Sequence, residues 1–379
     1  MTQGQVPAGA FVLPSDQESY KHRYLALGVA IKANVPVILW GAPGQGKTSV
    51  IKNFADKSGR KLEIILASIR EPQDFIGLPA LVDGEMRFMP PEWAKRLASE
   101  SNGGILFADE VNTAPPSVQA ALLRVCLEKV AGDFDLGIET RIVAAANPPE
   151  IAADGWDLAP PLANRFCHLD WILPAGVVAQ GLAGAWPTYE LPAADDADIA
   201  DHLQNERLLV AGFLTAQSHR VTDMPDSSTD QGRAFPTPRS WETVTRVSGM
   251  VSALNLPEEI RYLLVNGCVG EPATAEYLAY RENQDLPDPE EVIANPQMIL
   301  PGRPDQLYML TGSVMRALNK DFTPARWEKV GEFITRLFKD NHPDVAMALN
   351  MNWSKLAPAG TPIDRGILRD IAPFVQLML

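Results

Sequence analysis

The sequence predicts an α/β fold, in which a parallel sheet is covered by helices on both faces and is followed by largely helical regions. Two observations support this prediction. Short apolar runs alternate with helical patterns through the first half of the chain, as expected for parallel strands that are buried on both faces. Beyond Leu173 the apolar runs stop and helical patterns dominate. The expected strands are residues 35–40, 62–67, 104–109, 140–146 and 167–173.

Two helices can be placed between these strands. One begins at Lys47 and ends at Gly59, because glycine adopts a left-handed C-terminal cap at little cost. The other follows Pro115 and Pro116, which suit the first turn of a helix. Its apolar face comprises Val118, Leu122, Val125 and Cys126.

A hairpin interrupts this alternation in the segment ALVDGEMRF. Asp83 and Gly84 form a two-residue turn signal between two short extended arms, so we expect a small hairpin that projects from the core. A second loop or hairpin is expected in residues 131–141, although this segment has no two-residue turn signal.

Composition divides the chain into three expected parts. The 379 residues are 46% apolar, which is enough for a large core and a smaller unit beside it. The acidic segment WPTYELPAADDADIA forms a linker after the strands, and a proline-rich stretch at residues 286–304 precedes the last helical block. We therefore expect a core at 1–185, a linker and α-helical lid at 186–290, and a C-terminal helical extension at 291–379.

The chain is acidic, with a formal net charge of −14 and a sequence pI of about 4.9. Such a surface repels polyanions, so nucleic acid is not a favoured partner. The three cysteines lie far apart without a CxxC pair, which favours reduced thiols over disulfides. No segment approaches the roughly 20 apolar residues of a membrane span, and the N-terminus lacks a signal-peptide pattern. We expect a cytoplasmic protein without membrane insertion.

A phosphate-binding loop (P-loop, Walker A) follows the first apolar strand. The segment GAPGQGKT fits GxxxxGK[ST] and opens directly into a helix, as this motif requires. Lys47 would reach the β and γ oxygens of ATP, and Thr48 would bind Mg²⁺. A dinucleotide fingerprint is the alternative, but Ser49 stands where that motif needs a third glycine. The expected nucleotide-binding residues are Gly41, Ala42, Pro43, Gly44, Gln45, Gly46, Lys47, Thr48 and Ser49.

Two adjacent carboxylates, Asp109 and Glu110, end the third expected strand, at the edge where open α/β sheets bind ligands (Walker B). We expect Asp109 to hold Mg²⁺ through its water shell and Glu110 to polarise the attacking water. A solvated acidic strand end is the alternative interpretation. The guanine-selecting NKxD motif of GTPases is absent, because the nearest segment, NKDF at residues 319–322, has no acid in the fourth position.

Asn147 ends the fourth expected strand and precedes Pro148 and Pro149, which restrict the direction of the chain. Its amide would then lie beside the γ-phosphate and orient the attacking water. An asparagine that only starts a turn before proline is the alternative.

These motifs resemble the MoxR branch of the AAA+ ATPases, whose helix-2 hairpin insert is shared with the midasin, dynein and magnesium chelatase lineages. The resemblance spans most of residues 30–290 and implies an AAA+ P-loop core with an α-helical lid. It also implies that Asn147 is sensor 1, Arg165 the arginine finger and Arg239 sensor 2. Seven pieces occur in the order that this branch uses: WGAPGQGKT, REPQDFIGLP, the hairpin, LFADEVNTAPPSVQAALLRVCLEKV, AAANPPE, PLANRF and PTPRSW.

The resemblance further implies a homo-hexamer in which Arg165 acts on the ATP of a neighbouring subunit. The direction in which Arg239 acts stays open. Two parts depart from the branch: the segment between Leu173 and the PTPR motif is long, and the helical block after residue 290 has no counterpart that aligns. Ser68 stands where relatives restrain the catalytic glutamate, but a small polar residue at a strand end is usually a cap, so it is not an expected site residue.

By this resemblance the protein is an ATPase that remodels or activates a partner, typically one with a von Willebrand factor A domain. Met86, Phe88 and Met89 in the hairpin are candidates for transmitting motion to that partner, with packing against the core as the alternative. A nucleic-acid motor with a nuclease partner is a second hypothesis, which the acidic charge opposes. A scaffold that binds ATP without hydrolysis is a third, which the full set of catalytic residues opposes.

Overall fold

The computed structural model describes residues 16–99, 103–148, 151, 156–184, 186–282, 286–340 and 342–356. Contacts between residues divide the chain into two compact units. Unit 1 comprises Met1–Ala193, Met224–Phe235 and Leu254–Gly270. Unit 2 comprises Ala194–Asp223, Pro236–Ala253 and Glu271–Leu379. The chain therefore passes between the units several times, whereas the division expected from composition is sequential and stays a prediction.

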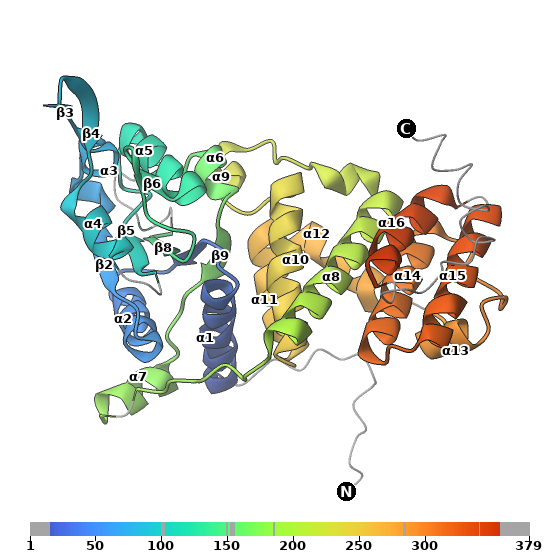
Figure 1. The fold of residues 1–379 in the computed structure, drawn as a ribbon. Helices are drawn as coiled ribbons and strands as arrows, with labels where there is room; N and C mark the ends of the chain where they lie inside the picture. The colour runs from blue at the N-terminus through green and yellow to red at the C-terminus, as the bar shows by residue number, and fades with distance from the viewer. Residues whose placement is uncertain are drawn as a thin grey trace, which may run out of the picture. The chain divides into compact units, whose positions relative to one another are not determined.

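Unit 1 is built on a five-stranded parallel sheet with the strand order β2-β5-β8-β1-β9 (Figure 1). This sheet confirms the α/β fold class and all five expected strands. The fifth strand ends at Asp170, three residues earlier than expected, because its neighbour β1 ends at Trp40, the residue that pairs with Asp170. The strands are β1 (Val37–Trp40), β2 (Leu62–Leu66), β5 (Ile105–Asp109), β8 (Arg141–Ala146) and β9 (Cys167–Asp170).

Helices cover both faces of this sheet, as the uninterrupted apolar strands require. Side chains of α3 (Gln73–Ile76), α4 (Glu92–Ala98), α5 (Pro116–Glu128) and α6 (Pro160–Ala163) form one buried cluster with the sheet. The other face is covered by α1 (Asp16–Lys32), α2 (Lys47–Ser58) and α11 (Glu258–Val269) (Figure 1). The short helices α7 (Ala175–Leu182) and α9 (Ser228–Gln231) complete the helices of the described part of unit 1, beside the 3₁₀ turn Ala67–Ile69.

The predicted helix ends are confirmed. Gly59 has φ 61° and donates its backbone N–H to the carbonyls of Ala55 and Asp56, so a left-handed cap ends α2. Pro115 and Pro116 lie at the start of α5, where a proline removes no intrahelical hydrogen bond.

The expected hairpin consists of β3 (Leu78–Val82) and β4 (Glu85–Met89), which pair antiparallel. Asp83 and Gly84 have φ of 54° and 83°, the two positive values that a tight hairpin turn requires. The side chains of Met86 and Phe88 are 68% and 40% exposed, so neither is packed into the core. A second, very short hairpin is formed by β6 (Val130–Ala131) and β7 (Phe134–Asp135), within the segment where a loop or hairpin was expected.

Unit 2 is helical in its described residues. Proline-rich sequence at residues 286–304 contains one short helix, which Asp288 caps by accepting a hydrogen bond from the backbone N–H of Glu290. A face-to-face pair, Trp327 and Trp353, lies in the core with ring centroids 4.2 Å apart. The helices are α8 (Asp196–Ala216), α10 (Pro238–Ala253), α12 (Glu271–Glu282), α13 (Pro289–Ala294), α14 (Pro304–Lys320), α15 (Pro324–Lys339) and α16 (Pro343–Trp353), with 3₁₀ turns at Ser218–Val221 and Ser354–Leu356.

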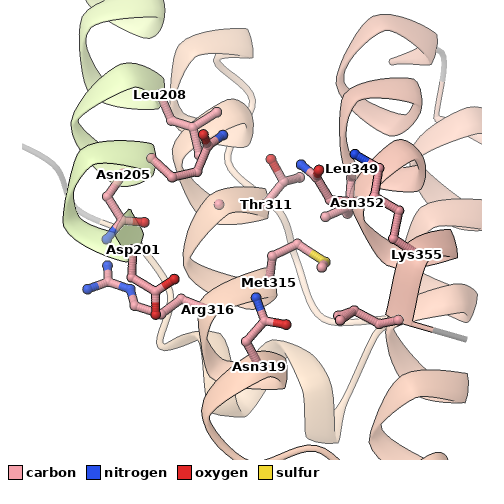
Figure 2. A pocket seen from close by; sticks show the side chains of 13 residues that line it. Asp201, Asn205, Leu208, Thr311, Met315, Arg316, Asn319, Leu349, Asn352 and Lys355 are labelled. Carbon is pink, nitrogen blue, oxygen red and sulfur yellow. The ribbon is translucent and has the colours of Figure 1, made fainter. Parts of the chain in front are cut away.

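A cavity of about 360 Å³ lies among α8, α14 and α16 of unit 2 (Figure 2). Leu208, Met315 and Leu349 give it apolar walls, and Asp201 and Arg316 contribute charges from neighbouring helices.

Across the part of the chain that the structure describes, no helix is both long enough and apolar enough to span a membrane.

Candidate nucleotide-binding site

The P-loop connects β1 to α2, at the end of the sheet where the parallel strands terminate. Gly46 has φ 67°, a left-handed conformation that favours glycine, and α2 begins at the next residue. A Cβ at Gly41 would overlap the carbonyl oxygen of Trp171. Gln45 is bonded to the same segment after β9. Its backbone oxygen accepts a hydrogen bond from Trp171 Nε1 at 3.0 Å, and its Oε1 accepts one from Leu173 N at 2.8 Å. Residues that follow β9 therefore fix the conformation of the loop.

Lys47 is the centre of this site and is only 8% exposed. Its Nζ donates to the carbonyls of Gly41 and Ala42 and, at 3.1 Å, to Oδ1 of Asn147. Burial lowers the pKa of Lys47, and the negative charges of Asp109 and Glu110 oppose that change. Because a partly buried cation is poorly screened by salt, this ammonium group is suited to hold an anionic phosphate.

Thr48 and Asp109 come together from α2 and β5. The Thr48 hydroxyl donates to Oδ2 of Asp109 at 3.1 Å, and both side chains are partly buried. A hydroxyl and a carboxylate supply the oxygen ligands that Mg²⁺ prefers, usually together with nucleotide phosphates and water. The donor set of this pair therefore fits the metal expected from the sequence.

Glu110 has a strained backbone, with φ 56° directly after β5. A left-handed conformation at a residue other than glycine costs about 1 kcal/mol or more and persists only where the surroundings enforce it. Here Asp109 Oδ1 accepts from Glu110 N at 3.0 Å, and Val111 N donates to the carbonyl of Ala145 at 3.0 Å. Strain of this kind is often found at functional sites, where it directs a side chain to a required position.

Ser68 contacts the carboxylate of Glu110, with its Oγ 2.8 Å from Oε2. The sequence interpretation left Ser68 out because a small polar residue after a strand is usually a cap. Its position in the 3₁₀ turn Ala67–Ile69, after β2 and beside β5, brings it to the Glu110 carboxylate instead. The family resemblance indicated this contact, whereas the residue type alone favoured a cap, because the adjacency of the two strands is not contained in the spacing along the chain.

Asn112 is a second residue that the sequence interpretation missed. It is 2% exposed, and its side-chain amide forms two hydrogen bonds with the backbone of Asn147. Nδ2 donates to the Asn147 carbonyl at 2.8 Å, and Oδ1 accepts from the Asn147 N–H at 3.2 Å. These two bonds fix the backbone of Asn147, whose own side chain contacts Lys47.

A cavity of about 400 Å³ adjoins the P-loop. It is lined by Gly44 and Gly46 of the loop, by residues of α2, and by residues of α1 and of the segments after β9 and α7, among them four aromatic side chains. Tyr24 OH donates to Oδ1 of Asn53 at 2.7 Å, so the amide nitrogen of Asn53 is left to donate to another group. The aromatic residues that line the cavity are Tyr20, Tyr24, Trp171 and Trp186.

The two expected arginines lie elsewhere. Arg165 follows α6 and precedes β9, so it is at the end of the sheet opposite to the P-loop of its own chain. It is half-buried, and one guanidinium nitrogen donates to the carbonyl of Pro161. Arg239 lies in unit 2, exposed in the first turn of α10, and its role as sensor 2 stays a prediction.

Comparison with known proteins identifies similar sequences. Residues 36–166 match the family model of the AAA domain (dynein-related subfamily). The transcriptional regulatory protein XylR of Pseudomonas putida is 29% identical over 147 residues, covering 34% of this chain and 24% of XylR. The DNA-binding transcriptional regulator NtrC of Proteus hauseri is 29% identical over 141 residues, covering 35% of this chain and 29% of NtrC. The chain thus spans less than a third of the length of each of these two curated relatives.

Two solved structures are similar in part. A candidate ATPase from Cytophaga hutchinsonii matches with a TM-score of 0.41 and 18% identity, over 70% of this chain and 88% of that chain. A full-length MCM homologue from Methanopyrus kandleri matches with a TM-score of 0.38 and 18% identity, over 72% of this chain and 63% of that chain. On the family match and the strand order and loop geometry described above, residues 36–166 of this chain constitute an AAA domain of the dynein-related subfamily.

Proposed function

We propose that this protein is a magnesium-dependent ATPase that works as one subunit of a ring. The observation that carries the proposal is the convergence of Lys47, Thr48 and Asn147 with the two carboxylates Asp109 and Glu110 at the end of β5. Residues from the start of α2 and from the ends of two strands, β5 and β8, thus meet at a P-loop, which is the arrangement needed to hold a triphosphate and to activate water.

The cavity beside the P-loop supports the choice of a nucleoside triphosphate over inorganic phosphate. Of its four aromatic side chains, Trp186 is 53% exposed and can stack on a purine base, whereas Tyr20, Tyr24 and Trp171 are nearly buried. The amide of Asn53 can donate to a ring nitrogen of the base. A triphosphate on the P-loop and a base in this cavity would place one ligand across both features.

Each polar group has a distinct task in the proposed reaction. Lys47 neutralises charge on the β and γ oxygens, and Asn147 orients the water that attacks the γ-phosphorus. Glu110 accepts a proton from this water as it attacks, and the Ser68 hydroxyl holds the carboxylate until then. Thr48 and Asp109 would hold Mg²⁺, which stabilises negative charge on the β and γ oxygens.

The position of Arg165 supports action on a neighbouring subunit. Val37 pairs with Cys167 and Trp40 with Asp170, so these two levels of the sheet are about 10 Å apart along the strands. Arg165 comes before Cys167, at the start of β9, whereas the P-loop follows Trp40, at the end of β1. Arg165 is therefore at the far end of the strands from the P-loop of its own subunit, and a ring would present it to the γ-phosphate of the next.

We further propose a MoxR-type remodeller that acts on a protein partner with a von Willebrand factor A domain, assembled as a homo-hexamer with Arg239 as sensor 2. The ordered motif series supports the branch and, through it, the partner class. The hairpin β3–β4 supports a protein contact, since Leu81 and Met86 lie opposite each other and are 72% and 68% exposed.

Substitution of Lys47 by alanine tests nucleotide binding directly. We expect Lys47→Ala to lose binding of ATP with Mg²⁺ in isothermal titration calorimetry, because the buried cation for the phosphates is removed. Lys52→Ala is the matched control, since Lys52 lies in the same helix with its side chain exposed. Unchanged ATP affinity in Lys47→Ala, with the fold intact by circular dichroism, would contradict the proposed site.

A further inference from the structure

We propose that His168 is a positioning residue for Arg165, which it connects to the strand end that precedes the P-loop. The proposal rests on the function proposed above, because it assigns a partner to the arginine finger of that ATPase. The structural feature that carries it is a chain of hydrogen bonds from Trp40 through His168 to Ala163.

The first bond joins two neighbouring strands. Trp40 is the last residue of β1, and its indole Nε1 donates to Nδ1 of His168 in β9 at 2.9 Å. The two rings are nearly parallel, with an angle of 12° between their planes. Gly41, the next residue after Trp40, is the first glycine of the P-loop, and its carbonyl accepts a hydrogen bond from Lys47.

The second bond reaches the turn that carries Arg165. An indole N–H can only donate, so Nδ1 of His168 is the acceptor and its proton resides on Nε2. Nε2 then donates to the carbonyl oxygen of Ala163 at 2.9 Å. The same oxygen accepts from Phe166 N at 3.1 Å, which closes the turn over Arg165. His168 therefore adds a side-chain bond at the oxygen on which this turn closes.

The imidazole is neutral, as both bonds require. The pKa of His168 is lowered to about 4, mainly by burial; the charge of Arg233 also lowers it, and the hydrogen bond to Ala163 opposes the change. Arg233 stacks on Trp40, with its guanidinium carbon 4.0 Å from the centre of the Trp40 ring. It also forms an ion pair with Asp170 at 3.2 Å. On the opposite side, α11 packs so closely that a Cβ at Gly267 would overlap the His168 carbonyl oxygen.

These contacts specify what His168 does in the proposed reaction. Its bond to Ala163 sets the position of the turn from which Arg165 extends. A misplacement of about 1 Å at a catalytic group can cost on the order of a hundred-fold in rate. Loss of the His168 bond should therefore lower the rate of hydrolysis at the active site of the neighbouring subunit, whereas nucleotide binding in the same subunit should remain.

The test compares His168→Leu, which keeps an apolar side chain of similar size, with His168→Gln, which can accept from Trp40 and donate to Ala163. We expect His168→Leu to lower kcat of ATP hydrolysis about a hundred-fold with the KM for ATP unchanged. His168→Gln should retain most of the activity. In rings mixed with Lys47→Ala subunits, His168→Leu should regain hydrolysis, because the Lys47→Ala subunits supply a correctly placed Arg165.

Two results would overturn this proposal. Parental kcat in His168→Leu would show that the bond to Ala163 is dispensable. Failure of mixed rings to regain hydrolysis would show that the defect lies in the mutant's own site. A parallel mixture of Arg165→Ala with Lys47→Ala separates the two hypotheses. If this mixture does not hydrolyse ATP, the arginine finger in trans is refuted. If this mixture hydrolyses ATP but the mixture with His168→Leu does not, only the role of His168 is refuted. If His168→Leu does not fold, Trp40→Phe, which removes the indole donor, takes its place in the same mixtures.

Discussion

Glu110→Gln is expected to abolish steady ATP hydrolysis while ATP binding is retained. Glutamine keeps the size and hydrogen-bonding capacity of the side chain, and its oxygen can still accept from the Ser68 hydroxyl. It cannot accept a proton from the attacking water. Proton transfer by a positioned side chain is worth about a hundred-fold or more in rate, so kcat should fall by at least that factor. The rate of phosphate release at saturating ATP and Mg²⁺ measures kcat.

Glu128→Gln is a matched control for this substitution. Glu128 lies on the exposed surface of α5, paired with Arg124, and exposed pairs of this kind contribute about 0.5 kcal/mol or less. Its kcat should equal that of the parent. Hydrolysis at the parental rate in Glu110→Gln would remove Glu110 as the catalytic base and would leave its strained backbone without a functional explanation.

Arg165→Ala is expected to lose turnover by about a thousand-fold while ATP affinity is unchanged, since arginine fingers contribute that much or more to kcat. The affinity is retained because Arg165 lies at the opposite end of the sheet from the P-loop of its own subunit. Arg124→Ala, an exposed arginine of α5, provides the control for loss of a surface cation.

Mixing distinguishes a finger that acts in trans from one that acts in cis. Lys47→Ala subunits bind no nucleotide but keep Arg165, and Arg165→Ala subunits keep the P-loop but lack the finger. Rings that contain both should hydrolyse ATP at those interfaces where an intact P-loop meets an intact arginine. Absence of hydrolysis in mixed rings whose mass has been confirmed would place Arg165 outside the catalytic interface.

The local features of the fold and of the site were predictable because each follows from adjacent residues. The loop GAPGQGKT, the cap at Gly59 and the turn at Asp83 and Gly84 depend only on the backbone freedom of glycine and on near neighbours. Four of the five strands, β1, β5, β8 and β9, are almost entirely buried and were clear because strands covered on both faces are largely apolar; β2, which is only partly buried, was found from its apolar run LEIIL.

Ser68, Asn112 and His168 could not be assigned in this way. The Ser68 contact requires β2 to lie beside β5, and the His168 contact requires β9 to lie beside β1, so both depend on strand order. Asn112 bonds to the backbone of Asn147, which is 35 residues away in the sequence. Buried polar side chains acquire their partners from tertiary packing, and residue type and spacing leave those partners open.

Dependence of ATP hydrolysis on protein concentration tests the central claim, a catalytic site shared between subunits, most directly. Specific activity should be measured over a dilution series, with particle mass followed in parallel with and without ATP and Mg²⁺. The account predicts that specific activity rises as ring-sized particles form, since Arg165 cannot serve its own P-loop. Full activity from a monomer at every concentration would contradict both the ring and the arginine finger.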